Sequence, residues 1–151
     1  MRPLSLAAGL FALTACGTRT GSAVTFTVDD DAETFTDLEH DGIVVECRGD
    51  AESVWVSMAR TLFDDIKGPT FRVEMTLGGY GGEPPDEGAE YRVADLRPGI
   101  GYHGDVWPRD HGTVTVTDFV AVNEVNRVAV TLSGVGDGER ISLDGEIVCV
   151  R

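Results

Sequence analysis

Short runs in which apolar and polar residues alternate restrict the possible folds of this chain more than any other feature of its sequence. Residues 24–28, 71–77, 113–117 and 128–132 place an apolar side chain at every second position. A period of two directs alternate side chains to opposite faces of an extended strand, so each run predicts a strand with one buried face. Valine, phenylalanine and threonine are frequent in these runs, as is typical of strands.

Glycine-rich segments separate the runs and indicate where the chain turns. Residues 78–85 combine glycine and proline in an order that predicts a loop. Residues 134–138 predict a hairpin between two strands. Asp144 and Gly145 fit either a tight turn or a bulge, because the alternation continues through Gly145 in phase.

The spacing of the runs predicts an all-β domain. Runs at 43–47, 54–58, 91–93 and 140–150 complete a set of roughly seven or eight strands, which is typical of an antiparallel β-sandwich. A closed β-barrel is the alternative architecture. Residues 60–67 depart from the pattern, since their apolar residues recur at helical spacing before a glycine and a proline. A short helix or an irregular crossover is expected there.

The first residues have the composition of an export signal. Arg2 is followed by an uncharged, mainly apolar run over 4–13, which has the length of a signal-peptide apolar region and is too short to span a bilayer comfortably. The run ends in Leu13-Thr14-Ala15-Cys16, which resembles the lipobox of bacterial lipoproteins. That resemblance implies a diacylglycerol on the Cys16 sulfur and cleavage just before Cys16. An ordinary cleaved signal, in which Cys16 is incidental, is the alternative.

This resemblance divides the chain into three parts. Residues 1–15 are then a lipoprotein signal peptide, residues 16–23 a lipidated cysteine with a flexible tether, and residues 24–151 a single β domain. The protein is expected on the outer face of the cytoplasmic membrane, or in the outer membrane of a Gram-negative host. Gly17 follows the cysteine where inner-membrane lipoproteins of such hosts usually carry aspartate, which favours the outer membrane in that case.

Cys47 and Cys149 are the two cysteines that the lipid does not use. Each lies in a strand-like apolar run, and an exported protein meets an oxidising compartment, so a disulfide between them is expected. Such a bridge closes a loop of about 100 residues, for which chain entropy gives on the order of 4–5 kcal/mol. A reactive thiol is the alternative, although neither cysteine has a local histidine, a glycine-rich turn or a CxxC partner.

The two cysteine-bearing strands carry a second resemblance. GIVVEC at 42–47 and EIVC at 146–149 are similar to strands in a group of small actinobacterial lipoprotein antigens with a β-sandwich fold. The resemblance implies the same fold here. It implies no catalytic residues and leaves the function open.

The charge of the chain excludes one class of partner. The formal net charge is −14, and every one of the 26 acidic residues lies beyond Cys16. A domain with this charge repels nucleic acid and anionic lipid headgroups. We therefore expect no DNA or RNA partner, and contact with the membrane only through the lipid anchor.

The segment 102–112 is the strongest candidate for a contact surface. It gathers Tyr102, His103, Trp107, Arg109 and His111 in an otherwise acidic, threonine-rich domain. Tyrosine, tryptophan and arginine dominate binding hot spots, and histidine with carboxylate can bind transition metals. The spacing matches no metal motif, however. The alternatives are a solvated loop with its tryptophan packed on the edge of the sandwich, and a segment whose Trp107 and Tyr102 cap the core.

No other motif indicates chemistry. The acidic residues at 29–33 lack the order of a calcium-binding loop, and the glycines at 78–82 lack the order of a phosphate-binding loop. The chain has no GxSxG elbow and no HExxH pair. We expect no metal and no cofactor.

The sequence therefore predicts a non-enzymatic, lipid-anchored protein of the cell envelope with a binding or structural role. Its partner is a protein or another envelope ligand that the sequence does not identify. Two alternatives stay open: an envelope hydrolase that uses carboxylates from the loops, and a carrier that binds a metal or small ligand through the loop from His103 to His111.

Overall fold

The computed structural model describes residues 21–60, 70–79, 82–96, 98–102, 105–106, 111–134 and 141–151. Its strands belong to two sheets, which we call sheet A and sheet B. Sheet A contains β1 (Ala23–Val28), β2 (Asp31–Thr36), β6 (Glu90–Arg92), β9 (Thr113–Ala121), β10 (Val125–Ser133) and β11 (Ile141–Val150). Sheet B contains β3 (Ile43–Gly49), β4 (Ser53–Arg60), β5 (Phe71–Gly78), β7 (Gly99–Tyr102) and β8 (Asp105–Val106). A single turn of helix, α1 (Val93–Leu96), follows β6 and precedes β7.

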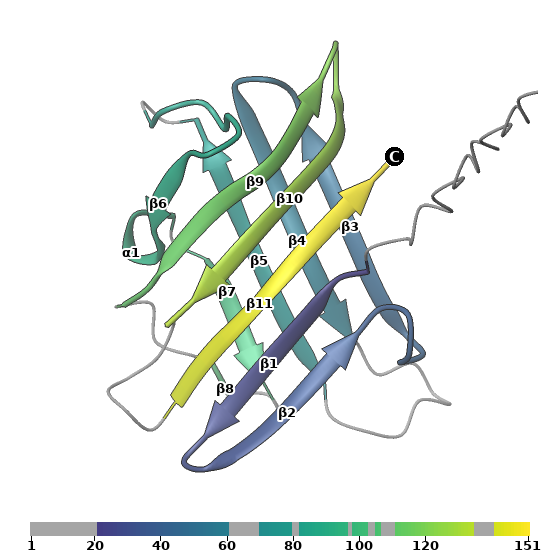
Figure 1. Ribbon diagram of the computed structural model, residues 1–151, viewed down its shortest axis with the longest axis vertical. Helices are drawn as coiled ribbons and strands as arrows, with labels where there is room; N and C mark the ends of the chain where they lie inside the picture. Colours follow the sequence, from purple (N-terminus) through teal and green to yellow (C-terminus); the bar gives the residue numbers. More distant parts are fainter. Residues whose placement is uncertain are drawn as a thin grey trace, which may run out of the picture.

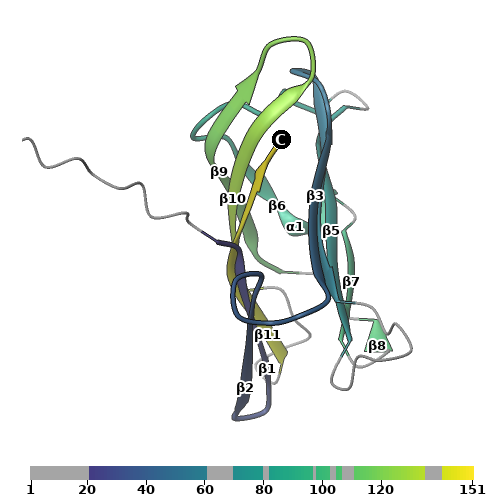
Figure 2. The ribbon, with the colours of Figure 1, turned by 90° about the vertical axis from the view of Figure 1, so that its right-hand side faces the viewer.

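The two sheets pack face to face as an antiparallel β-sandwich (Figures 1 and 2). The strand order is β2-β1-β11-β10-β9-β6 in sheet A and β3-β4-β5-β7-β8 in sheet B. Within the described residues each sheet ends in two different edge strands. The predicted sandwich is thus confirmed, and the closed barrel is wrong.

Most of the predicted strands are present. The runs at 24–28, 43–47, 54–58 and 71–77 form β1, β3, β4 and β5, and the later runs form β9, β10 and β11. The strand predicted at 91–93 is only partly correct, because β6 ends at Arg92 and Val93 begins α1. Val93 is buried all the same, so its apolar character reflects the core and not a strand.

Three strands have no counterpart in the prediction: β2, β7 and β8. The acidic segment at 29–33 contains the turn between β1 and β2 and half of β2 itself. Asp29 has a φ of 55°, a left-handed conformation that aspartate tolerates in turns. Of the residues in β2, Phe35 alone is buried, so the strand lacks the alternation that identifies the others.

The predicted helix near 60–67 falls almost entirely outside the described residues. Arg60 is the last residue of β4, and the structure describes none of residues 61–69. No helix in the described part of the chain is long and apolar enough to cross a membrane.

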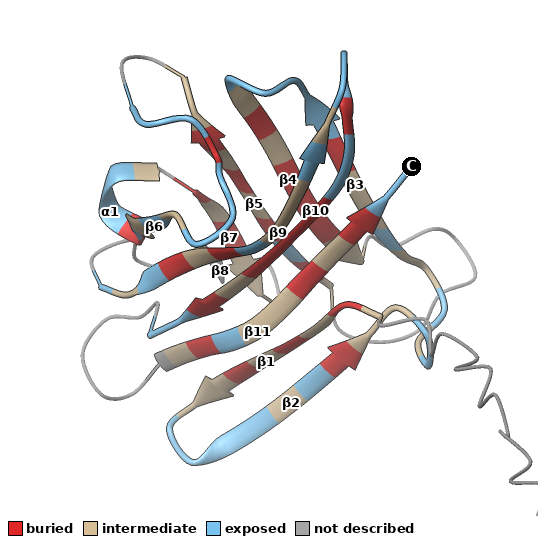
Figure 3. Ribbon diagram, turned by 45° about the horizontal axis from the view of Figure 1, so that its top comes forward, coloured by how far each residue is buried: buried red, intermediate tan, exposed pale blue. Residues whose placement is uncertain are grey.

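Alternate residues of the strands form one apolar core between the sheets (Figure 3). In β5 the inward side chains are Phe71, Val73, Met75 and Leu77, all buried, and the residues between them are less so. Burying one such side chain contributes about 1.5–3 kcal/mol, so the faces of the two sheets are held together mainly by this layer.

Strand β11 lies in the interior of sheet A. It pairs with β1 from Ala23↔Glu146 to Val28↔Ile141, and with β10 along its other edge. Gly145 takes part in both ladders without a shift in register, so it is neither a tight turn nor a bulge. A Cβ atom at this position would collide with the carbonyl oxygen of Ala23, which explains why glycine is needed there.

Candidate functional site

The predicted contact segment 102–112 is only partly described. Tyr102 is the last residue of β7, and His111 is exposed just before β9. His103, Trp107 and Arg109 lie outside the described residues. Whether His103 and His111 converge, as metal binding would need, is therefore still a prediction.

Tyr102 packs against the core. Its ring stacks on Phe26 of the opposite sheet, with 4.7 Å between ring centroids and planes 8° apart. Its hydroxyl donates a hydrogen bond to the carboxylate of Glu33 in β2. Burial raises the pKa of Tyr102, and the hydrogen bond and the negative charge of Glu33 raise it further. Tyr102 thus joins the two sheets at the end of the sandwich where β2 and β7 meet.

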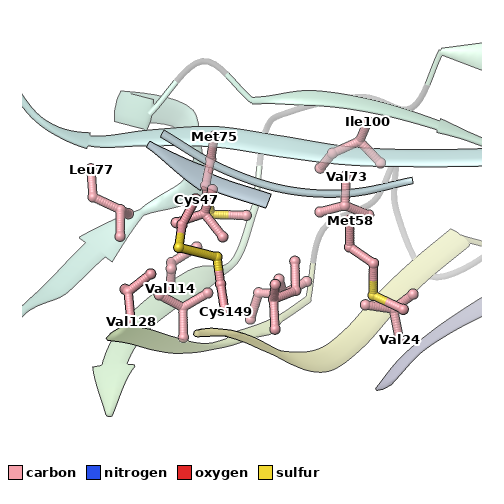
Figure 4. Close-up of a cluster of buried hydrophobic side chains, with 14 of the residues drawn as sticks. Val24, Cys47, Met58, Val73, Met75, Leu77, Ile100, Val114, Val128 and Cys149 are labelled. Carbon is pink, nitrogen blue, oxygen red and sulfur yellow. A yellow bond between two sulfur atoms is a disulfide. The ribbon is translucent and has the colours of Figure 1, made fainter. Parts of the chain in front are cut away.

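The disulfide between Cys47 and Cys149 is present, as predicted (Figure 4). Cys47 belongs to β3, an edge strand of sheet B, and Cys149 to β11 in sheet A, so the bridge connects the two sheets across the core. The Cα atoms are 5.9 Å apart and the cysteines are 102 residues apart in sequence. Both sulfur atoms are bonded to each other, so neither is a free thiol nucleophile.

No metal site is visible in the described segments. Within them, no group of three or more histidine, cysteine or acidic residues is placed to hold a metal ion. The acidic residues Asp31 and Glu33 belong to β2 and pair with residues of β1.

Residues of β5 in sheet B, and of β6 and α1 on the side of sheet A, line a cleft. Its volume is about 1100 Å³. It is lined by Thr76, Gly78, Gly79, Gly82, Glu83, Glu90, Tyr91, Arg92, Asp95 and Leu96. We call it the β5–β6 cleft.

The cleft exists because β7 is shorter than β5. The four residues of β7 pair with β5 only from Phe71 to Glu74. The remaining half of β5, from Met75 to Gly78, pairs with β4 on one edge and with no described strand on the other. Since α1 carries the chain from sheet A to sheet B before β7 begins, it bounds the cleft and does not fill it.

The charges in the cleft are mainly negative. Arg92 forms a bidentate ion pair with Asp95, at 2.8 Å and 3.1 Å, so these two residues largely neutralise each other. Glu83 and Glu90 are exposed and have no cationic partner among the described residues. The residues that line the cleft therefore include two glutamates without a cationic partner in the described part of the chain.

Tyr91 contributes an aromatic ring to the lining of the cleft. Its hydroxyl donates a hydrogen bond to the carbonyl oxygen of Glu83, at 3.1 Å. Burial raises the pKa of Tyr91, and the charges of Asp86 and Glu83 raise it further. Tyr91 is thus a hydrogen-bonding group in partly dry surroundings, and the nearby carboxylates make a smaller contribution to its raised pKa.

The carboxyl groups in the described lining of the cleft are exposed to solvent. A general acid at neutral pH needs a carboxyl group held in dry surroundings that raise its pKa. Glu83, Glu90 and Asp95 are all exposed. The described part of the cleft therefore offers charge, hydrogen bonds and an aromatic ring, without a buried carboxyl group.

A smaller groove, of about 390 Å³, lies beside the disulfide. It is lined by Asp37, Ile43, Val44, Val45, Val148, Cys149 and Val150. Val44 and Val150 are 49% and 70% exposed, which gives the groove an apolar wall.

The attachment point of the predicted tether lies near this groove. Ser22 is fully buried, and its hydroxyl binds both backbone groups of Val148 in β11. Its backbone amide donates to the Asp37 carboxylate at 2.9 Å. The chain is thus fixed to the sandwich from Ser22 onward.

The sequence indicated the loop beside the β5–β6 cleft but not the cleft itself. The glycines and prolines at 78–85 correctly predicted that β5 ends at Gly78. The cleft also depends on β7 pairing with half of β5, and no local pattern encodes that. Comparisons with protein-family models, with curated proteins and with solved structures found no match to this chain.

Proposed function

We propose that this chain is a lipid-anchored protein of the cell envelope that binds a partner through the β5–β6 cleft. The proposal combines the lipobox-like tetrapeptide that ends at Cys16 with the position of the cleft in the sandwich. Its role is recognition and not catalysis.

The observation that carries the proposal is the separation between the attachment point and the cleft. Ser22 precedes β1, near one edge of sheet A, whereas β6 is the opposite edge strand. Between β1 and β6 lie β11, β10 and β9, so the two strands are roughly 20 Å apart at the usual strand spacing. Figure 1 shows β6 and α1 on the far side of the molecule from the start of β1.

The short tether would hold the β1 edge near the membrane and leave the distant cleft accessible. The chain from Cys16 to Ser22 spans at most about 20 Å when fully extended, so the β1 edge stays near the membrane surface. The net charge of −14 repels anionic headgroups and discourages the domain from lying flat on them. Under these conditions the β5–β6 cleft points away from the bilayer and is open to a partner.

Site-directed photo-crosslinking in the native envelope tests this proposal. A photoreactive amino acid replaces Glu90 inside the cleft or, as a control, Glu39, which is exposed beyond β2 near the attachment point. We expect a discrete cross-linked product from position 90 that is absent from position 39 and is lost when Cys16→Ala prevents anchoring. Equal products from both positions, or a product from position 39 alone, would contradict the proposal.

A further inference from the structure

In sheet B, the half of β5 from Met75 to Gly78 is paired along one edge only by the described strands. Strand β5 pairs with β4 along its whole length, from Ser53↔Gly78 to Arg60↔Phe71. On its other edge the ladder to β7 stops at Glu74. In an antiparallel strand, alternate residues direct both backbone groups to the same neighbour, so the segment from Met75 to Gly78 presents donors and acceptors at this edge that no described strand pairs.

No described part of the chain satisfies these groups. Among the described residues, no backbone hydrogen bond links the outer edge of Met75–Gly78 to a turn or loop. The opposite wall of the cleft is formed by β6 and α1, with Glu90, Tyr91 and Leu96 on its surface. An open strand edge beside a cleft is the arrangement that accepts an added strand from another chain.

The other edges of the sandwich are less suited to this. Strand β2 carries Asp31 and Glu33, and β6 has only three residues. Strand β3 is a longer edge strand that lines the smaller groove, but the volume of that groove is about 390 Å³ against about 1100 Å³ for the β5–β6 cleft. Among the described residues, the half of β5 from Met75 to Gly78 therefore combines a free strand edge with the larger of the two openings.

The size and lining of the cleft indicate a chain segment in preference to a small molecule. Its volume of about 1100 Å³ lies at the upper end of the range for small-ligand pockets, about 300–1,000 Å³, and leaves room for an extended chain segment. Such pockets are mostly apolar, whereas Leu96 and the ring of Tyr91 are the main apolar groups here. A ligand would therefore be recognised chiefly through its backbone and its charge.

The negative charge of the cleft lining favours a ligand with basic side chains. Glu83 and Glu90 are uncompensated, because Arg92 is engaged by Asp95. We propose that the β5–β6 cleft binds an extended peptide segment carrying lysine or arginine, which pairs with β5 at Met75–Gly78 as an additional strand of sheet B. This inference rests on the proposed function and names the class of partner.

The test uses the full lipidated chain in detergent micelles and a labelled heptapeptide of alternating valine and lysine. We expect this peptide to bind, and a matched peptide of valine and glutamate to bind at least about tenfold more weakly. Hydrogen exchange of the complex should show new protection at 75–79 and none along β3. Equal binding of the two peptides, or protection confined to β3, would overturn the proposal.

Because the whole protein is acidic, a matched charge control is essential. The double variant Glu83→Gln/Glu90→Gln should weaken binding of the lysine peptide by roughly five- to twentyfold. The control Glu39→Gln/Glu87→Gln removes the same charge from exposed residues that do not line the cleft, and it should change binding less than twofold. A similar loss in both variants would mean that net charge alone attracts the peptide, and the proposal would fail.

A second probe separates strand pairing from side-chain attraction. Methylating alternate backbone nitrogens of the lysine peptide removes strand donors but keeps its charge, and we expect at least a tenfold loss of binding. Unchanged binding would show that no strand is added. Failure here leaves the photo-crosslinking test of the proposed function intact, since a partner of another class would still react at position 90.

Discussion

The hydroxyl of Ser22 makes two hydrogen bonds to a single residue of the last strand: it accepts from the Val148 amide at 2.9 Å and donates to the Val148 carbonyl at 3.1 Å. The ladder between β1 and β11 ends at Ala23↔Glu146, so Ser22 satisfies the next pair of outward backbone groups on β11. One side chain therefore extends the sheet where the predicted tether enters the domain.

Ser22→Ala should destabilise the protein by about 1–3 kcal/mol, because it leaves two backbone groups of Val148 without a partner. Chemical denaturation followed by tryptophan fluorescence measures the free energy of unfolding. Ser142→Ala is the matched control, since Ser142 is also on β11 and its side chain has no hydrogen bond within the described residues. Equal losses in the two variants would contradict the role given to Ser22.

Removing the disulfide should have a larger effect. Cys47→Ala/Cys149→Ala releases a constraint between residues 102 apart, for which we expect a loss of about 2–5 kcal/mol. Intact mass before and after reduction and alkylation shows whether the two thiols are bonded in the purified protein. Free alkylation of both cysteines without reductant would rule the bridge out.

The lipid anchor is tested by Cys16→Ala. The unmodified sequence, expressed in a host with the lipoprotein pathway, should partition into detergent, and the variant should stay unprocessed or aqueous. The thioether-linked lipid also adds a mass to the N-terminal peptide. Identical partitioning and mass behaviour of the two proteins would refute lipidation.

Tyr102 gives a prediction about pH. Its pKa is raised in the folded protein, so the folded state retains the phenol proton at pH values where the unfolded chain has lost it. The contribution is complete below the ordinary tyrosine pKa of 10.0 and is lost as the pH rises above it. The wild type should lose stability at alkaline pH more steeply than Tyr102→Phe, measured by denaturation across that range. Parallel curves would contradict this coupling.

Gly145 gives a prediction about packing. Gly145→Ala places a methyl group against the Ala23 carbonyl and 2.8 Å from the Val24 Cα, so we expect a loss of about 1–3 kcal/mol. Asp144→Ala, at the exposed neighbouring position, should change stability by less than about 0.5 kcal/mol. Thermal denaturation of the two variants distinguishes them, and equal melting temperatures would contradict the close approach.

The strands that could be predicted are those whose burial follows the local alternation. The alternate residues of β5, from Phe71 to Leu77, are buried as their pattern indicates. Strand β2 could not be found in this way, because its residues at 31–34 are mostly exposed and acidic and its position depends on pairing with β1. Pairing with β1, and not a pattern in its own residues, determines where β2 forms.

The same distinction applies to the candidate site. The disulfide could be predicted because the argument needed only the number of cysteines left beyond Cys16 and the oxidising compartment expected of an exported protein. Tyr102 was expected either at a contact surface or as a cap of the core, and its ring stacks on Phe26 in the core. Its partner could not be predicted, because only the three-dimensional arrangement brings these two residues together. The β5–β6 cleft was missed since it depends on where β7 stops beside β5.

The interior position of β11 constrains the order of events during synthesis. Strands β1 and β10 both need β11 as their partner, so sheet A cannot close until residues 141–150 have left the ribosome. The disulfide also waits for this strand, because Cys149 lies near its end. Folding that depends on contacts so distant in sequence is slow. In the export route that we propose, this late closure would keep sheet A open while the chain passes through a narrow translocation channel.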